Sequence, residues 1–148
     1  MFIPTDALLQ AMMVNELDAT PGAGALTGLD IQLFTNSPVL NRTTVLADLT
    51  TPAYAGYANL VGVVFGALHR RDDGGWCVDS PLTTWDMNDN VLPTTIMGYG
   101  IFLPAGTVLY GAEYLPAPVT LTTTLDLLNL ITQFCLGGTD WGQCTVIP

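Results

Sequence analysis

The stretch from Pro93 to Gln133 limits the folds open to this chain more than any other part of it. It predicts three successive strands, at residues 94–103, 107–114 and 119–134. A Pro-Ala-Gly turn signal at 104–106 joins the first two into an antiparallel hairpin, since Pro fixes φ and Gly accepts positive φ. Pro116 and Pro118 are expected to end the second strand, because proline cannot donate to a sheet ladder. The third strand is expected to reach back across the hairpin and extend the same sheet.

Upstream of this stretch, short apolar runs predict further strands. They lie at residues 29–35, 43–49, 59–68, 76–79 and 83–88. Leu29, Ile31 and Leu33 alternate with polar residues, a pattern typical of a half-buried strand, and glycines inside 59–68 indicate a bulge or a close backbone approach. Many short strands with almost no helix predict an all-β protein, an antiparallel β-sandwich or jelly-roll-like fold, with residues 28–148 as one domain.

The first 27 residues are expected to form a short helix or arm outside that domain. Leu8, Met12 and Leu17 fall near helical spacing, and Asp6 and Glu16 argue against an export signal. Two alternatives stay open: an arm that docks on a neighbouring subunit, or a helix that covers its own sheet. The apolar ends of the chain supply the candidate partner contacts: Phe2, Ile3, Val146 and Ile147.

Charge excludes two classes of partner. The 148 residues carry a net charge of −10, with Arg42, Arg70 and Arg71 as the only Lys or Arg residues. Neither nucleic acid nor an anionic membrane surface is expected as a partner, because both need clustered basic residues. Charged residues make up only 11% of the chain, against about 25% in an average soluble protein. This composition fits a subunit covered by an assembly, or a viral or secreted β-protein with a Thr- and Asn-rich surface.

The residues that usually carry chemistry do not form a recognisable constellation. His69 has no nucleophile motif beside it, and the Asp-Asn loop after Asp86 lacks the Gly and Glu that a calcium-binding EF-hand loop requires. Sequence does not show whether Glu113 and Asp126 approach each other. No catalytic, metal or cofactor site is predicted, and the chain is not expected to be an enzyme.

The three cysteines have no zinc-binding spacing. Cys135 and Cys144 flank a Gly-rich loop and are close enough in sequence for a disulfide. Without an export signal, three reduced thiols are the favoured interpretation.

Several phrases of the chain, taken in order, resemble those of small tailed-phage virion proteins. The matching segments are Leu33-Phe34-Thr35-Asn36, Thr44–Thr50, Gly56-Tyr57-Ala58, Trp85, Gly98–Phe102, Gly106–Glu113, Pro116 and Leu121–Gln133. The resemblance covers roughly residues 29–134, and the shared order is more specific than any single phrase. The N-terminal segment and the Cys-containing tail lie outside it.

The resemblance implies a β-sandwich accessory protein of a phage particle, without catalytic residues. The expected function is capsid decoration (cement): binding the outside of the shell, on the virion surface, after synthesis in the cytoplasm of the host cell. The expected partners are the major capsid protein and further copies of the chain, as a homotrimer. A tail, neck or fibre accessory module is the first alternative. A carbohydrate-binding sandwich is the second, and it requires exposed aromatic rings among Tyr54, Tyr57, Trp76, Trp85 and Trp141.

Overall fold

The computed structural model describes residues 3–5, 27–54, 57–66, 69–70, 76–86, 93–103, 108–123, 125–136 and 144–147. Within these residues it contains β1 (Ile3–Pro4), β2 (Thr27–Phe34), the 3-10 helix η1 (Leu46–Asp48), β3 (Leu60–Val64), β4 (His69–Arg70), β5 (Trp76–Asp79), β6 (Thr83–Asp86), β7 (Thr94–Phe102), β8 (Leu109–Leu121), β9 (Leu127–Leu136) and β10 (Cys144–Ile147). Every strand pairing is antiparallel. The all-β prediction is confirmed, while the finer β-sandwich or jelly-roll assignment stays a prediction.

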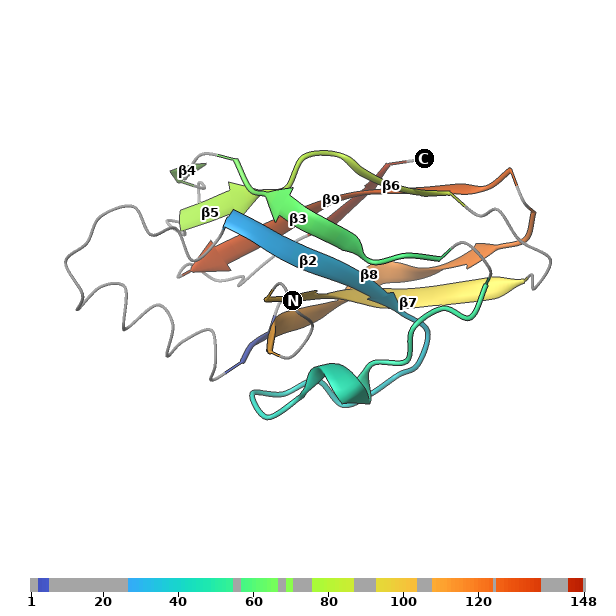
Figure 1. Cartoon of the computed structure of the whole chain (residues 1–148), viewed down its shortest axis with the longest axis horizontal. Helices are drawn as coiled ribbons and strands as arrows, with labels where there is room; N and C mark the ends of the chain where they lie inside the picture. The colour runs from blue at the N-terminus through green and yellow to red at the C-terminus, as the bar shows by residue number, and fades with distance from the viewer. Residues whose placement is uncertain are drawn as a thin grey trace.

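The strands form two sheets. Sheet I has the order β1-β8-β7-β2-β3, and sheet II has the order β10-β9-β5-β4, with β6 also paired to β9. Figure 1 shows β9 and β6 running above β7 and β8. One hydrophobic cluster joins the sheets and is called the inner cluster here: Leu29, Ile31 and Leu33 of β2 and Tyr99 and Ile101 of β7 share it with Trp85 of β6 and Leu128 and Leu130 of β9. Burial of this shared face holds the two sheets together.

The opposite face of sheet I carries a second, smaller cluster, called the outer cluster here. Its buried members are Phe34, Leu49, Phe102, Leu109 and Ala112. Successive strand residues point to opposite faces, so Leu33 faces the inner cluster and Phe34 the outer one. Both faces of β2 and β7 are therefore buried, and on β2 even the polar residues Asp30 and Gln32 are only 7% and 5% exposed.

The predicted hairpin is confirmed, but the prediction that Pro116 and Pro118 end its second strand is wrong. β8 continues to Leu121, and its pairing with β7 jumps from Tyr114 opposite Gly98 to Val119 opposite Ile96. Four residues of β8 thus lie opposite one residue of β7. This bulge holds both prolines where no ladder hydrogen bond is required of them.

The predicted strand 119–134 is split: β8 ends at Leu121, β9 begins at Leu127, and the chain turns between them. The backbone N–H groups of Thr122 and Thr123 donate to Asp126 Oδ2 at 2.6 and 2.9 Å. The carboxylate thus accepts the hydrogen bonds that the carbonyls of a neighbouring strand would otherwise accept. After the turn, β9 joins sheet II instead of extending the hairpin. The chain therefore crosses from one sheet to the other at Asp126.

Asp126→Ala is expected to lower the melting temperature at pH 7, and this difference from wild type should shrink in acid. Hydrogen bonds from the Thr123 and Thr122 backbone lower the pKa of the Asp126 carboxyl. A carboxylate with a lowered folded-state pKa stabilises the fold above its unfolded-state pKa and loses that contribution as pH falls through the folded value. Thermal unfolding of both proteins from pH 7 down through about pH 4 measures this. A difference that does not change with pH would contradict the role of the charge.

Segments 43–49 and 59–68 differ from prediction. The first is not a strand: it contains η1 and belongs to a loop that covers sheet I. The second is shortened to β3, and the bulge that its glycines predict is present. The β2–β3 register shifts twice, and Gly62 has a φ of 67°, where its N–H donates to Asp30 Oδ1 at 2.9 Å.

Where β3 stops pairing with β2, the Tyr57 side chain accepts the next hydrogen bond from β2. The last β2–β3 pair described is Ile31 with Leu60, and beyond it the Leu33 N–H donates to the Tyr57 hydroxyl at 2.8 Å. That hydroxyl donates in turn to Asn59 Oδ1 at 2.9 Å. Burial raises the pKa of Tyr57, so the hydroxyl stays protonated at neutral pH.

Tyr57→Phe is expected to reduce the free energy of unfolding by about 2 kcal/mol, because it leaves the buried Leu33 N–H without an acceptor. Tyr54→Phe is the matched control. The Tyr54 ring packs edge-to-face on Tyr57 at 5.4 Å, but its buried hydroxyl has no hydrogen-bond partner among the described residues, so its removal should be neutral or stabilising. Urea unfolding of both variants measures the difference. Equal effects would contradict the role of the Tyr57 hydroxyl.

Residues 3–5 of the predicted arm lie on sheet I. Ile3 and Pro4 pair with Ala112 and Gly111 of β8. Thr5, which is buried, continues this contact: its N–H donates to the Tyr110 carbonyl at 2.7 Å and its hydroxyl to the Leu109 carbonyl at 2.5 Å. The N-terminal strand thus extends sheet I along the edge of β8. Residues 6–26, where the helix is predicted, lie outside the described residues.

Candidate interaction surface

Residues 35–50 form a closed loop on the outer face of sheet I, called the Ω-loop here. Its ends meet where the Thr35 N–H donates to the Thr50 carbonyl at 2.9 Å. The Asn36 side chain closes the loop a second time: its Nδ2 donates to the Asp48 carbonyl at 2.7 Å, and its Oδ1 accepts from the Thr50 N–H at 2.9 Å. A loop of this length with bonded ends is a compact structural unit.

The Ω-loop is also fixed to the sheet beneath it. Leu49 is buried in the outer cluster with Phe34, and the Tyr114 hydroxyl of β8 donates to the Pro38 carbonyl. The rings of Phe34 and Tyr114 pack edge-to-face with centroids 5.5 Å apart. In Figure 1 the loop and η1 lie below the layer formed by β7 and β8. Anchored at its ends and in its middle, the loop presents its tip in one conformation.

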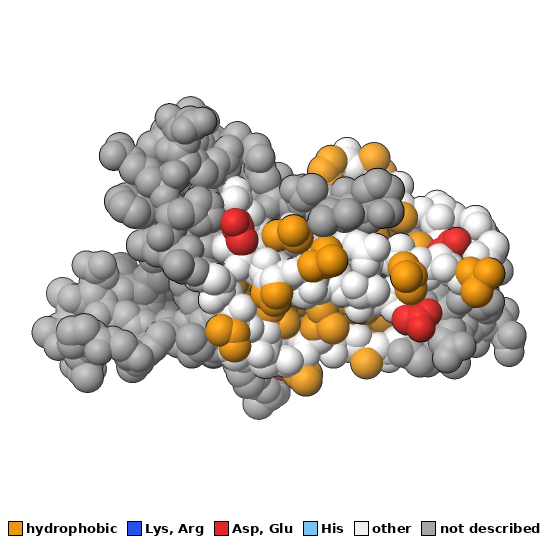
Figure 2. Space-filling view, turned by 90° about the horizontal axis from the view of Figure 1, so that it is seen from above, with side chains coloured by type: hydrophobic (Ala, Val, Ile, Leu, Met, Phe, Trp, Pro, Cys, Tyr) orange, Lys and Arg blue, Asp and Glu red, His pale blue; other side chains and the backbone are white. Residues whose placement is uncertain are grey.

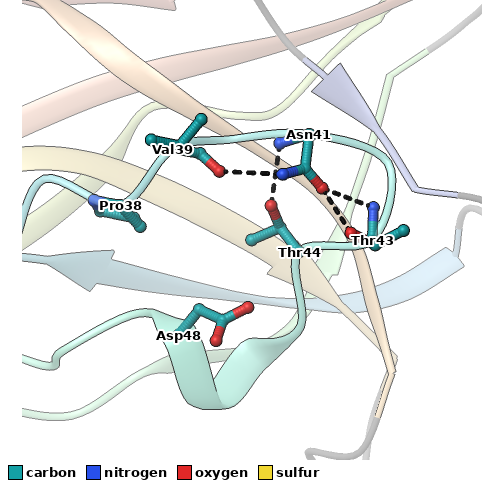
Figure 3. Close-up of a pocket in the computed structure, with 6 residues that line it drawn as sticks. All are labelled: Pro38, Val39, Asn41, Thr43, Thr44 and Asp48. Atoms are coloured by element: carbon teal, nitrogen blue, oxygen red, sulfur yellow. Dashed lines mark hydrogen bonds between the residues drawn. The ribbon is translucent and has the colours of Figure 1, made fainter.

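A depression in this loop is lined by Pro38, Val39, Asn41, Thr43, Thr44 and Asp48 (Figure 3). Its polar groups are engaged with one another. Asn41 Oδ1 accepts from the Thr43 N–H and hydroxyl at 2.8 and 2.7 Å, and Asp48 Oδ2 accepts from the Val45 N–H at 2.9 Å. These contacts shape the loop. The one carboxylate in this lining is that of Asp48.

Large apolar side chains are exposed at several places on the two sheets and their loops, with Leu82 and Leu127 about half exposed at 55% and 54%. On the Ω-loop, Val39 is 85% exposed and Val45 54% exposed. On β3, at the edge of sheet I, Val61 is 75% exposed and Val64 61% exposed. At the β8–β9 turn, Leu125 is 87% exposed. Figure 2 shows one face of the molecule, on which apolar side chains lie among polar surface and acidic side chains. Exposed apolar groups on rigid elements are typical of protein–protein contacts.

Sequence reasoning missed these residues. The candidate contacts were placed at the chain ends, whereas the described apolar exposure concentrates in the Ω-loop, in β3 and at a turn. One signal was available for the loop. Val39 follows Pro38 in a segment rich in Ser, Asn and Thr, where a large apolar residue has no periodic pattern that would bury it.

The residues predicted at the chain ends are only partly described. Ile3 lies in β1. In β10, Val146 and Ile147 pair with Leu130 and Asn129 of β9. Phe2 lies outside the described residues. Their role as partner contacts stays a prediction.

Two of the five aromatic residues considered for sugar binding are buried. Tyr54 is 4% exposed and Trp85 3% exposed, both in the inner cluster, so neither ring faces solvent as stacking on a sugar would require. Burial raises the pKa of Tyr54 to about 12. Tyr57 packs against the same cluster, Trp76 lies in β5, and Trp141 lies outside the described residues.

Other residues singled out in the sequence are separated by the fold. His69 lies in β4 opposite Cys77, and Asp86 ends β6, while the loop that follows it lies outside the described residues. Glu113 is buried on β8, where Tyr99 Oη donates to Glu113 Oε2 at 2.5 Å, whereas Asp126 holds the β8–β9 turn. Glu113 thus serves the packing of the inner face.

Comparisons with protein-family models, with curated proteins and with solved structures find no match to this chain. In the part of the chain that the structure describes, no three His, Cys, Asp or Glu side chains gather as metal ligands would. Among the same residues, no helix is long and apolar enough to cross a bilayer.

Proposed function

We propose that this protein is a viral structural protein, a decoration (cement) protein that binds the outside of a tailed-phage capsid. Its partner is the major capsid protein, its location is the virion surface, and copies of the chain associate as trimers at symmetric positions. It stabilises the shell through contacts between subunits. Each copy contributes a modest contact, and repetition over the lattice makes the sum large.

One observation carries the proposal: phrases that resemble phage virion proteins, far apart in sequence, pack on one another in the outer cluster. Phe34 comes from the first phrase, Leu49 from the second, Phe102 from the strand phrase of β7, and Leu109 and Ala112 from the phrase of β8. These phrases therefore specify one structural unit, the Ω-loop on sheet I. The proposal takes the shared order of these phrases as a sign of a shared role.

The surface of that unit supports a docking role. The Ω-loop is held in place by the Asn36 and Tyr114 contacts, so little conformational entropy is lost when it binds. It presents Val39, which is 85% exposed, to a partner. Charged residues make up only 11% of the chain, as suits a protein whose surface is buried against other subunits.

The test is binding to capsids that lack this protein, measured by co-sedimentation with purified wild-type chain and with Val39→Asp. Burying a valine contributes about 1.5–3 kcal/mol, so the variant should bind at least about tenfold more weakly. Leu125→Asp, which places the same charge at the equally exposed β8–β9 turn, is the matched control and should bind like wild type.

Two outcomes count against this account in different ways. If wild type does not bind, and capsids lacking it survive heating as well as complete ones, the decoration function is wrong. If wild type and Val39→Asp bind equally, the function stands and the Ω-loop is not the contact. The melting temperature of Val39→Asp should match wild type, since the side chain is exposed.

A further inference from the structure

Cys77 of β5 and Cys135 of β9 occupy directly opposed positions in sheet II. The two strands pair antiparallel, with Trp76 opposite Leu136, Cys77 opposite Cys135 and Asp79 opposite Gln133. Opposed residues of an antiparallel pair project to the same face of the sheet. The opposed pair Asp79 and Gln133, two residues along the ladder, shows this shared face directly. Its side chains meet, since Gln133 Nε2 donates to Asp79 Oδ1 at 2.7 Å.

The hydrogen bonds fix which kind of opposed pair this is. The Ser80 N–H donates to the Thr132 carbonyl at 2.8 Å, and the Thr132 N–H donates back to Ser80 Oγ at 2.9 Å, so Ser80 and Thr132 occupy a hydrogen-bonded position of the ladder. The Asp79 carbonyl instead accepts from the Gly66 N–H at 2.7 Å, which turns it away from β9. Hydrogen-bonded and non-hydrogen-bonded pairs alternate along an antiparallel ladder.

The alternation makes Cys77 and Cys135, two positions from Asp79, a non-hydrogen-bonded pair. The Cα atoms of such a pair lie about 4.5 Å apart, which falls within the range of roughly 4.4–6.8 Å that a disulfide spans. The backbone therefore already has the separation that a cross-strand disulfide requires.

Cys144 is placed differently. It lies opposite Thr132 in the β9–β10 ladder, three positions along β9 from Cys135. That offset is about 10 Å along the strand, beyond the separation that a disulfide bridges without backbone movement. The register thus favours Cys77 over Cys144 as the partner of Cys135, in contrast to the sequence-based pairing.

We propose that Cys77 and Cys135 form a reversible disulfide that links β5 to β9, with a small-molecule disulfide such as oxidised glutathione as the oxidant. One thiol loses its proton and attacks the oxidant, which gives a mixed disulfide and releases a glutathione thiolate. The second cysteine, also as thiolate, attacks the mixed disulfide and releases a second glutathione thiolate. Two protein thiols are oxidised and one glutathione disulfide is reduced. The inference rests on the strand register alone and is independent of the proposed function.

The link should stabilise the fold, because it constrains a long stretch of the unfolded chain between two strands. The oxidised protein is therefore expected to melt at a higher temperature than the reduced protein. The effect should be reversed by a dithiol reductant.

The test uses the full chain, equilibrated with oxidised or with reduced glutathione, then alkylated and mapped by peptide mass spectrometry without reduction. The expected result is a Cys77–Cys135 linked peptide, a monomer lighter by two hydrogen atoms, and alkylation of Cys144 alone. In Cys144→Ser the same monomer should lose both remaining thiols and gain melting temperature on oxidation. Cys135→Ser should gain none.

Three results would overturn the proposal: alkylation of all three cysteines after oxidation, a link that contains Cys144, or a disulfide between molecules in Cys144→Ser. The Cys144→Ser variant keeps both proposed partners, so the test does not depend on whether loss of Cys77 or Cys135 impairs folding.

Discussion

Gly98→Ala is expected to reduce the free energy of unfolding by about 3 kcal/mol, the upper part of the range for overpacking a filled site. A Cβ at this position would lie 2.2 Å from the Glu113 carbonyl oxygen and 2.4 Å from Phe34 Cζ. The first contact is with backbone of the paired strand and cannot be relieved by a side-chain rotation. β7 and β8 would have to separate, and the Phe34 ring would have to leave its place in the outer cluster.

Substitutions at two other glycines, Gly100 and Gly66, are expected to destabilise the protein less than Gly98→Ala. At Gly100 the nearest atom to an added Cβ is Leu49 Cδ1 at 2.7 Å, a flexible side-chain end, so Gly100→Ala should cost less than Gly98→Ala. At Gly66 the nearest atom is the Asp79 carbonyl oxygen at 3.5 Å, an ordinary contact, so Gly66→Ala is the control. Urea unfolding of the three variants gives the ranking. A Gly98→Ala protein as stable as Gly66→Ala would contradict the described packing of the Ω-loop on sheet I.

Leu130→Ala is expected to reduce the free energy of unfolding by about 3 kcal/mol, within the range of about 2–5 kcal/mol for such truncations. Leu130 of β9 is 0% exposed and belongs to the inner cluster shared by the two sheets. The variant would leave a cavity between layers whose strands are fixed by their own ladders, so the site cannot collapse freely.

Leu125→Ala makes the same chemical change five residues away, at the β8–β9 turn, where the side chain is 87% exposed. It should change stability by less than about 0.5 kcal/mol. Both variants lose the same side-chain atoms. The difference between their free energies of unfolding therefore measures the contribution of burial at Leu130. Similar effects from both would show that β9 does not pack on sheet I as described.

Sequence reasoning found the strands whose alternation or turn chemistry is local. β2 follows from the alternation of Leu29, Ile31 and Leu33. The β7–β8 hairpin follows from the Pro-Ala-Gly signal at 104–106, which itself lies outside the described residues. Both signals lie within a few residues of the structure they specify, so no knowledge of distant partners is needed.

The errors arose where the outcome depends on a distant partner. Pro116 and Pro118 do not end β8, because β7 leaves them opposite a bulge. The run after Val119 does not continue as one strand, since Asp126 closes a turn and sends β9 to the other sheet. Segment 43–49 alternates poorly and becomes a loop, because the outer face of sheet I offers Leu49 a place to be buried.

The candidate interaction surface was less predictable than the fold. An exposed side chain such as Val39 cannot be told from a buried one until the path of the loop is known, and that path depends on Asn36 and Tyr114 contacts across the chain. The positions of the cysteines relative to one another depend on distant contacts in the same way. Cys135 and Cys144 are close in sequence, whereas Cys77 is the cysteine that strand pairing brings opposite Cys135.

The central claim is that the protein covers a phage shell. The most direct measurement is the position of labelled copies on intact virions by electron microscopy, with a tag placed at the exposed β8–β9 turn beside Leu125. The account predicts label repeated over the whole shell at symmetry-related positions. Label confined to one vertex would contradict it and assign the protein to the tail, neck or fibre. Particles without label would show that the protein is not part of the virion.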